Sequence, residues 1–145
     1  MSAIGNPLET QCTCAAIRQA ARRVTRLYDQ ALAPHGLRIT QYPILVSLAI
    51  NGPATIGVLA ARMVLDRATL GHNLRPLLAG GLVAVETGAD RRGRVVTLTP
   101  DGRDRLRAAR PEWEAAQQAF DGAFGAEEAA SLRATMGRVA RLTVG

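Results

Sequence analysis

The sequence predicts a mainly α fold that also contains one small β-hairpin, in a chain of 145 residues. Apolar side chains recur at steps of three and four over most of the chain, which is the spacing of amphipathic helices. Two short segments, 83–85 and 96–98, instead place valine or leucine at alternate positions and flank a polar loop with glycines at both ends. That pattern is typical of a hairpin. The 48% share of apolar residues is enough to build the core of one domain of this length.

The first third of the chain is predicted to form two helices. The first runs from about Cys12 to Ala33 and ends at Pro34-His35-Gly36. Its apolar stripe consists of Ile17, Ala20, Ala21, Val24, Leu27 and Ala31. The second is expected to begin at Thr40 and to carry Pro43 in its first turn, where a missing N–H costs little. Asn51-Gly52-Pro53 should end it.

Two shorter helices follow in close succession. Thr55 and Asp66 are placed as N-caps, because their side chains can accept hydrogen bonds from the first turn of a helix. In the second of these helices the leucines lie on one face, at Leu70, Leu74 and Leu77. The opposite face carries Ala68, Gly71, His72 and Arg75. Small residues beside a histidine and an arginine make a surface that can approach a partner closely and donate hydrogen bonds. Gly80-Gly81 should stop this helix.

The hairpin comes next, with Val83 and Val85 facing one way in its first strand and Val96 and Leu98 in its second. Its loop carries three arginines, at Arg91, Arg92 and Arg94. Helix, turn, helix and a hairpin with a basic tip is the order of a winged helix-turn-helix. In that motif the second helix enters the major groove of DNA and the hairpin loop reaches the backbone or the minor groove.

Two further helices are predicted after the wing. Thr99 should cap the first, with Pro100 at its first position. Pro111 lies inside its apolar pattern and should kink the helix or split it in two. The last helix is expected from Ala126 to about Thr143. Apolar stripes on the long helices at both chain ends favour a homodimer, because a two-fold protein matches a two-fold DNA site.

The charge is distributed in a way that supports nucleic-acid binding. The net charge is +6, and all 18 basic residues are arginines. Residues 62–110 hold ten arginines against five acidic residues, whereas residues 111–145 hold three against five. The positive charge therefore coincides with the part of the chain that would contact phosphates.

Several short motifs, in order, resemble the DNA-binding lobe of the MarR family of bacterial transcriptional regulators. They are Leu59-Ala60, Asp66-Arg67-Ala68-Thr69-Leu70, Gly81-Leu82-Val83, Asp90-Arg91-Arg92 and the run from Val96 to Gly102. The resemblance extends more loosely from about Cys14 to the C-terminus. It implies a homodimer in which the first, fifth and sixth helices of both subunits interlock. It also implies an effector pocket between the dimer lobe and the DNA-binding lobe, for which Arg22, Tyr42 and Leu45 are the expected lining residues.

The combined reading is a winged helix-turn-helix with a helical dimerisation lobe. Residues 1–145 would form a single MarR-like domain, with 12–50 and 100–145 as dimerisation helices and 51–99 as the DNA-binding lobe. The protein would be a homodimeric transcriptional repressor, released from a pseudo-palindromic site in double-stranded DNA by a small organic ligand. The residues expected to contact DNA are Arg67, Ala68, Thr69, His72 and Arg75 in the recognition helix and Arg91, Arg92 and Arg94 in the wing.

The cysteines leave one alternative open. Cys-x-Cys in a cytosolic protein is not a typical structural disulfide. Arg18 lies one turn after Cys14 and could lower the pKa of its thiol. In the hydroperoxide-sensing branch of the family, a reactive cysteine near the start of the first helix is followed by tyrosines four and fourteen residues later. Cys14 and Tyr28 match that pattern, but Arg18 replaces the middle tyrosine. A thiol-based redox regulator using Cys14, with Cys12 and Tyr28, is therefore the alternative to ligand control.

Other function classes find less support in the sequence. Nothing in it resembles a catalytic motif, a phosphate-binding glycine loop or a set of metal ligands, so we expect no enzyme, no metal and no cofactor. No apolar run reaches the ~18 residues that span a bilayer, and the N-terminus does not resemble a signal peptide. We therefore expect a cytoplasmic protein with no membrane partner. A winged helix that binds protein instead of DNA is a further alternative, but its recognition face would be acidic or apolar.

Overall fold

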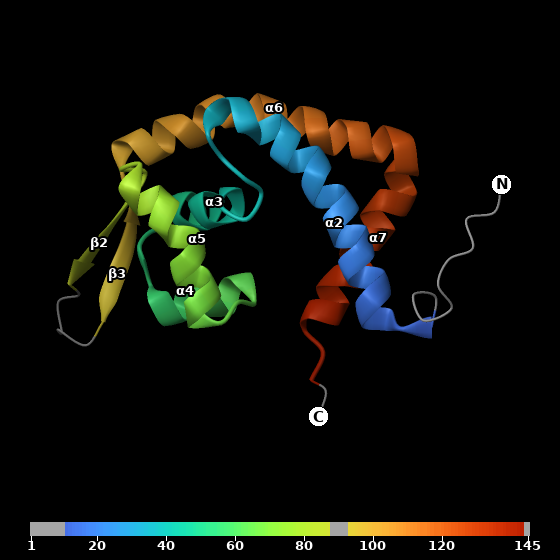
Figure 1. The fold of residues 1–145 in the computed structure, drawn as a ribbon, viewed down its shortest axis with the longest axis horizontal. Coiled ribbons are helices and arrows are strands. Elements are labelled where there is room, and N and C mark those ends of the chain that lie inside the picture. The colour runs from blue at the N-terminus through green and yellow to red at the C-terminus, as the bar shows by residue number, and fades with distance from the viewer. Residues whose placement is uncertain (1–10, 88–92, 144–145) are drawn as a thin grey trace.

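The computed structural model describes residues 11–87 and 93–143 and is mainly helical (Figure 1). Two lobes are bridged by one long helix: a winged lobe that contains the sheet, and a helical lobe that contains both ends of the described chain. The helices are α2 (Thr13–Leu32), the 3-10 turn η1 (Ala33–His35), α3 (Tyr42–Asn51), α4 (Ile56–Met63), α5 (Arg67–Ala79), α6 (Pro100–Phe124) and α7 (Ala126–Ala140). The strands are β1 (Ala54–Thr55), β2 (Val83–Thr87) and β3 (Arg94–Leu98).

The wing is a three-stranded antiparallel sheet with the order β1-β3-β2. Val83 pairs with Leu98 and Val85 with Val96, so the side chains predicted to share a face do so. The strand β1 was not predicted. It is two residues long, too short to show alternation, and it exists because Ala54 pairs with Val96 on the free edge of β3.

Side-chain caps start three of the helices as predicted. The Thr55 hydroxyl accepts from the Val58 N–H, the Asp66 carboxylate from the Thr69 N–H and the Thr99 hydroxyl from the Gly102 N–H. A predicted start at Thr40 is wrong by two residues, because α3 begins at Tyr42. Its Pro43 lies in the first turn as expected.

The central helix α6 is continuous from Pro100 to Phe124, so the predicted split at Pro111 does not occur (Figure 1). Pro111 and Arg107 are both exposed. The Arg107 carbonyl, which would have accepted from an N–H at position 111, therefore faces solvent and can bind water. The buried Ala109 and Ala116 on either side of the proline hold α6 against the rest of the protein.

The core lies in the winged lobe and at its junction with α2 and α6. The largest fully buried side chains, all between residues 32 and 96, are Leu32, Leu37, Ile44, Leu45, Leu48, Leu59, Leu70, Leu77 and Val96. Residues 12–50 were expected to belong with the dimerisation helices. The structure places α3 in the winged lobe instead, since it packs against α4, β3 and α6.

Polar contacts fasten the connection between α2 and α3 to the two helices beside it. The Asp29 carboxylate accepts from the Ile39 N–H at 2.8 Å, and Arg105 of α6 donates to the His35 carbonyl at 2.8 Å. The His35 ring also lies 3.0 Å from the Glu112 carboxylate. These contacts hold the winged lobe at a defined position relative to α2 and α6.

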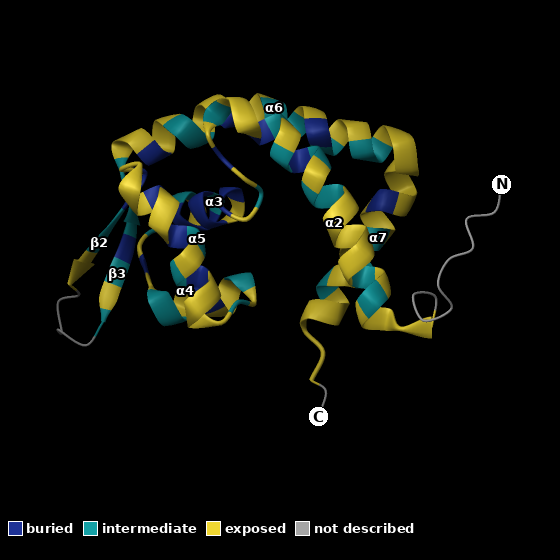
Figure 2. Cartoon of the chain, viewed as in Figure 1, coloured by how far each residue is buried: buried dark blue, intermediate teal, exposed yellow. Residues whose placement is uncertain are grey.

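The helical lobe, built from α2, the second half of α6 and α7, has little core of its own. Its buried residues beyond the junction are Tyr28, which is 9% exposed, and the small Ala116 and Ala129. Large apolar side chains are exposed instead (Figure 2): Phe124, Met136, Val139 and Leu142 are 51%, 37%, 38% and 64% exposed. Among the described residues, no helix is both long and apolar enough to cross a membrane.

Candidate functional site

Helix α5 is positioned by its leucines and by the cap at its start. Leu70, Leu74 and Leu77 are buried in the core, which fixes the rotation of the helix about its axis. At the N-terminus, the Asp66 carboxylate accepts from the Thr69 N–H at 2.7 Å. This backbone hydrogen bond, with a smaller contribution from the Thr69 side chain, lowers the pKa of Asp66 below its ordinary value. The carboxylate is therefore charged, and remains a good acceptor, at neutral pH.

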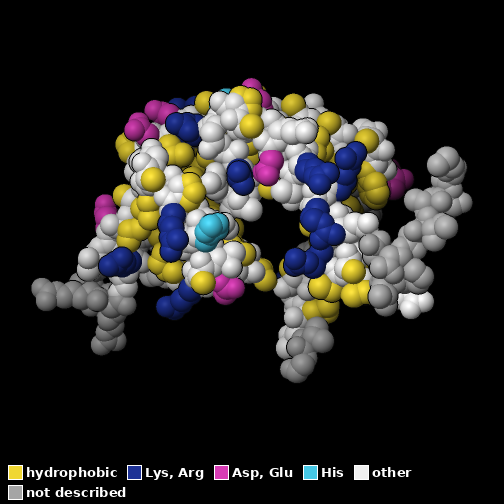
Figure 3. All heavy atoms as spheres, viewed as in Figure 1, with side chains coloured by type: hydrophobic (Ala, Val, Ile, Leu, Met, Phe, Trp, Pro, Cys, Tyr) yellow, Lys and Arg dark blue, Asp and Glu magenta, His cyan; other side chains and the backbone are white. Residues whose placement is uncertain are grey.

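The rotation of α5 leaves its polar face outside. All five recognition-helix residues predicted from the sequence are exposed: Arg67, Ala68, Thr69, His72 and Arg75. Figure 3 shows arginine and histidine side chains gathered over α5 on one face of the molecule. Donors and small residues on one exposed helical face suit direct contact with the edges of bases.

One of these arginines also has a contact inside the protein. A Cβ added to Gly57 of α4 would lie 3.2 Å from Nη2 of Arg67. The guanidinium group therefore rests over the first turn of α4, and the glycine leaves room for it. Both helices of the helix-turn-helix share this cation, a contact that the spacing of the sequence does not reveal.

The wing is described only in part. Arg94 begins β3, pairs with Thr87 of β2 and is exposed. Arg91 and Arg92, the other wing residues predicted to contact DNA, lie outside the described residues. A DNA contact by any of the three remains a prediction.

A cavity of about 810 Å³ lies between the two lobes. It is lined by residues of α2, the α2–α3 connection and α5, including Gln30, Arg38, Gln41, His72 and Asn73. The expected effector residues do not line it. Tyr42 stacks on Trp113 with ring centroids 5.7 Å apart, and burial raises the pKa of its hydroxyl. Leu45 is fully buried, and the exposed Arg22 lines a different cavity.

The sequence signal for this cavity is weak because its walls come from segments about 40 residues apart, 29–41 and 72–76. Within α5, His72 and Asn73 read as part of a single polar face. Only the packing of the α2–α3 connection beside α5 shows that Asn73 faces a cavity. Sequence reasoning missed Asn73, Arg38 and Gln41 for this reason.

The redox candidates are spread along α2. Cys12 is the N-cap of α2, where its sulfur accepts from the Ala15 N–H at 3.4 Å, and Cys14 lies in the first turn. Both thiols are free and exposed. They share a shallow cavity of about 330 Å³ with Arg18 and Arg22. Tyr28 lies about 21 Å further along the helix axis at 1.5 Å per residue, so the structure does not bring it to Cys14.

Tyr28 instead joins α2 to α6, since its hydroxyl donates to Oε1 of Gln117. Burial raises the pKa of this hydroxyl, with a further contribution from the nearby Asp121 carboxylate and an opposing one from Arg133. The phenol therefore stays protonated at neutral pH and can keep donating. This contact gives Tyr28 a structural role.

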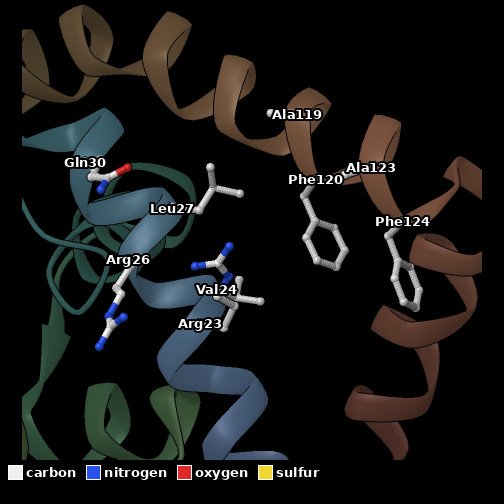
Figure 4. Close-up of a pocket in the computed structure, with 9 residues that line it drawn as sticks. All are labelled: Arg23, Val24, Arg26, Leu27, Gln30, Ala119, Phe120, Ala123 and Phe124. Atoms are coloured by element: carbon white, nitrogen blue, oxygen red, sulfur yellow. The ribbon is translucent and has the colours of Figure 1, made fainter. Parts of the chain in front are cut away.

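Two apolar cavities lie on the helical lobe. One, of about 540 Å³, lies between α2 and the end of α6, where Arg23, Arg26 and Gln30 line it beside the apolar side chains (Figure 4). Phe120 and Phe124 of α6 lie at its edge with ring centroids 5.4 Å apart, across from Val24 and Leu27 of α2. The other, of about 550 Å³, lies between α2, α6 and α7 and includes Ile17, Leu132 and Met136. No cluster of potential metal ligands occurs in the described part of the chain.

Comparison with known proteins agrees with this geometry. A family model described as "MarR family" matches residues 35–93, which span α3 to the start of the wing. The solved structure of the M. tuberculosis transcriptional regulator MosR in complex with DNA is 34% identical, with a TM-score of 0.75. Its match covers 90% of this chain and 99% of MosR.

Two other proteins are similar to this chain. The repressor CouR of Rhodococcus jostii RHA1, solved with a 23-mer DNA duplex, has a TM-score of 0.83. That match covers 97% of this chain and all of CouR, and at 21% identity it supports the fold alone. The uncharacterized HTH-type transcriptional regulator YwoH of Bacillus subtilis is 28% identical over 85 residues, 59% of this chain and 62% of YwoH. This chain thus spans less than two thirds of the length of YwoH.

The fold and the comparisons agree: α5 presents an exposed polar face beside the sheet, and the similarity to MosR extends along nearly the whole chain. This chain belongs to the MarR family of DNA-binding transcriptional regulators.

Proposed function

We propose that this protein is a homodimeric repressor that binds a pseudo-palindromic operator and is released from it by a small organic ligand. The observation that carries the proposal is the rotation of α5. Three buried leucines on one face leave five residues suited to DNA contact on the other. An acidic or apolar face there would favour a protein-binding module, and this face is neither.

Each subunit would place α5 in a major groove. Thr69, His72 and Arg75 would reach base edges or flanking phosphates, with Ala68 allowing close approach. Arg67 would bind phosphate from its place over α4. The three wing arginines, Arg91, Arg92 and Arg94, would bind the backbone or the minor groove. Support comes from their exposure where described and from the DNA complex of the related MosR.

Dimerisation would complete the helical lobe. A second copy of the same helices would cover two features of this lobe. These are the exposed side chains of Phe124, Met136 and Val139 and the two cavities beside α2. A soluble monomer with so many large apolar side chains on one small lobe would be unusual. Pairing two copies would also place two α5 helices for two half-sites.

Ligand release would use the cavity between the lobes. Because its walls include His72 and Asn73 of α5, a ligand there would touch the recognition helix as well as the α2–α3 connection. A ligand that prefers one spacing of the lobes would shift the distance between the two α5 helices and lower DNA affinity. The structure of CouR with p-coumaroyl-CoA is a precedent for a small-molecule complex in this fold. The earlier candidates Arg22, Tyr42 and Leu45 would influence such a ligand only indirectly.

The test compares operator binding by wild type and Arg75→Ala. If Arg75 reaches a base, its loss should cost about 1–3 kcal/mol on the preferred sequence and relax the preference at one position. The measurement is a titration of labelled DNA, with a scan of single base changes in the bound site. Arg107→Ala on α6 is the control, since that side chain is 75% exposed on the far helix and should leave affinity unchanged. Wild-type protein that binds no DNA at any salt concentration would refute the proposal.

A further inference from the structure

Helix α2 carries a row of exposed arginines that the recognition helix and the wing do not explain. Arg18, Arg22 and Arg26, here called the α2 arginine row, follow one another at steps of four residues, and all three are exposed. In an α-helix, each step of four rises about 6 Å and turns about 40°, so the three side chains share one face. The row therefore extends about 12 Å along α2.

No internal carboxylate compensates this charge. The helix contains four arginines and a single acidic residue, Asp29, which is engaged with the Ile39 N–H. Within residues 11–87 and 93–143, no ion pair involves the α2 arginine row. On α6 and α7 the pattern is mixed: Arg107, Arg110 and Arg133 pair with carboxylates, whereas no ion pair within the described residues involves Arg103 or Arg138. Like charges four residues apart destabilise a helix, so the row favours a bound anionic partner.

Arginine side chains of α2 are visible on the same side of the molecule as those of the recognition helix (Figure 3). Figure 3 shows arginine side chains over α2 and over α5 on the same face, on either side of the hollow between the lobes. In Figure 4, Arg26 points away from Phe120 and Phe124, the residues that mark the apolar side of α2. Arg26 and the neighbouring Arg23 nevertheless line the cavity beside Phe120 and Phe124, so the α2 arginine row borders the apolar side of α2, which is turned toward α6 and α7.

We propose that the α2 arginine row binds DNA phosphates between the two half-sites of the operator. The proposal rests on the proposed function, which makes DNA the partner. At about 3.4 Å of duplex axis per nucleotide of one strand, the 12 Å of the row would span three to four nucleotide steps if α2 lies along the duplex. Such contacts add affinity at any sequence and position the protein on the duplex. In a two-fold dimer, the two copies of α2 supply six arginines to the central segment of the site.

The experiment measures how steeply DNA affinity falls with salt. The variant Arg18→Gln/Arg22→Gln/Arg26→Gln removes the row and keeps side chains of similar length and helix propensity. The slope of log K against log salt should decrease by about one unit for each arginine that contacts a phosphate, and so by up to about six in the dimer. The loss should be equal for operator and unrelated DNA, and the preferred sequence should not change.

Two further variants make the result specific. Arg103→Gln/Arg107→Gln/Arg110→Gln on α6 changes the net charge by the same amount and should keep the wild-type slope. Arg18→Lys/Arg22→Lys/Arg26→Lys keeps the charge and should therefore keep most of the wild-type salt slope. Light scattering and circular dichroism show whether each variant keeps the wild-type mass and helix content.

The outcomes separate the two proposals. The α2 proposal would be overturned if the wild type binds the operator with a steep salt slope and the α2 glutamine variant has the same slope. The proposed function would then still stand. An equal loss of slope in the α6 variant would also overturn it, because net charge alone would then explain the effect. A flat slope for the wild type would count against DNA binding itself. The contact between the α2 arginine row and DNA phosphates is supported if the salt slope decreases only in the α2 glutamine variant and is recovered in the lysine variant.

Discussion

The winged lobe and the helical lobe differ in how much of their own apolar surface they bury. The winged lobe holds nearly all of the large fully buried side chains, from α3, α4, α5 and the sheet. It also has exposed apolar residues, such as Ile50 and Val64, but these stand outside a complete core. The helical lobe buries mainly alanines and exposes Phe124, Met136 and Val139. The first lobe therefore has a core of its own, while the second leaves apolar surface that the proposed dimer would cover.

The same contrast appears in the charges. On α5, the arginines stand opposite a leucine face that fixes their direction. The α2 arginine row, by contrast, borders an apolar face that is only half covered within one chain. A second copy would therefore position the α2 arginines as well as cover the apolar cavities. Dimerisation and the second basic surface are linked in this way.

The largest expected effect comes from placing a charge in the incomplete lobe. Val139 is 38% exposed in the single chain, so Val139→Asp should be tolerated by a monomer. In a dimer the carboxylate would be buried without a partner, at a cost of several kcal/mol. The molar mass measured by light scattering should therefore be twice the 15.4 kDa chain mass for the wild type and equal to the chain mass for Val139→Asp.

The matched control is Ile50→Asp on α3, where the side chain is 76% exposed on the winged lobe. This variant should keep the wild-type mass. If both variants, or neither, change the mass, the distinction between the two lobes fails.

The next effect in size tests the complete core. Leu70 is fully buried on α5, so Leu70→Ala should lower the free energy of unfolding by roughly 2–5 kcal/mol through lost contacts and a cavity. Urea unfolding followed by circular dichroism measures this. The control is Leu78→Ala on the same helix, where the side chain is 40% exposed. This substitution should lower the free energy of unfolding much less. Equal losses would mean that the winged lobe is not closely packed around α5.

A smaller effect is expected where α6 begins beside the end of α5. The Thr99 hydroxyl accepts from the Gly102 N–H at 3.0 Å and donates to the Gly81 carbonyl at 2.6 Å, joining the start of α6 to the end of α5. Thr99→Ala should cost about 1 kcal/mol in unfolding free energy, whereas Thr99→Ser should cost less because it keeps the hydroxyl. A loss of unfolding free energy as large as that of Leu70→Ala would mean that the Thr99 contacts matter as much as a core side chain.

The smallest effect is expected from oxidation at the start of α2. Cys12 and Cys14 are exposed and lie far from α5 along the chain and from Tyr28 along the helix. We expect mild hydroperoxide to leave operator binding unchanged in the wild type, Cys14→Ser and Cys12→Ser, by the same DNA titration. The redox alternative would be favoured over ligand control if hydroperoxide abolishes DNA binding by the wild type but not by Cys14→Ser, and if a dithiol restores that binding.

Local sequence signals were sufficient where a side chain acts on its own backbone. Thr55, Asp66 and Thr99 could be recognised as caps because each needs only the N–H groups three residues ahead. The leucine period of α5 likewise predicted which face of the recognition helix is exposed, because burial of one face follows from spacing alone. The exposure of the recognition-helix residues could therefore be anticipated, while their contact with DNA stays a prediction and Arg91 and Arg92 lie outside the described residues.

Where distant segments meet, sequence reasoning was insufficient. The strand β1 is defined by the edge of β3 and not by its own two residues. The start of α6 shows the same dependence: a Cβ at Gly102 would collide with the Leu82 carbonyl, so the glycine in the Asp101-Gly102 pair is required by a neighbour 20 positions away in the chain. Pro111 did not split α6, because contacts on both sides of it outweigh one lost hydrogen bond.

The sequence by itself determined the order of the longer helices and the hairpin, the helix starts that carry a side-chain cap and the polar face of α5, since all of these depend on residues within a turn or two of one another. Tertiary structure decided which polar residues share a space. It joined Asn73 and Arg38 in the cavity between the lobes, buried Tyr42 and Leu45 in the core, and brought arginines of α2 and α5 to one side of the molecule (Figure 3). These juxtapositions depend on how helices pack across long loops of chain, and packing is set by the sum of many apolar contacts rather than by any local pattern.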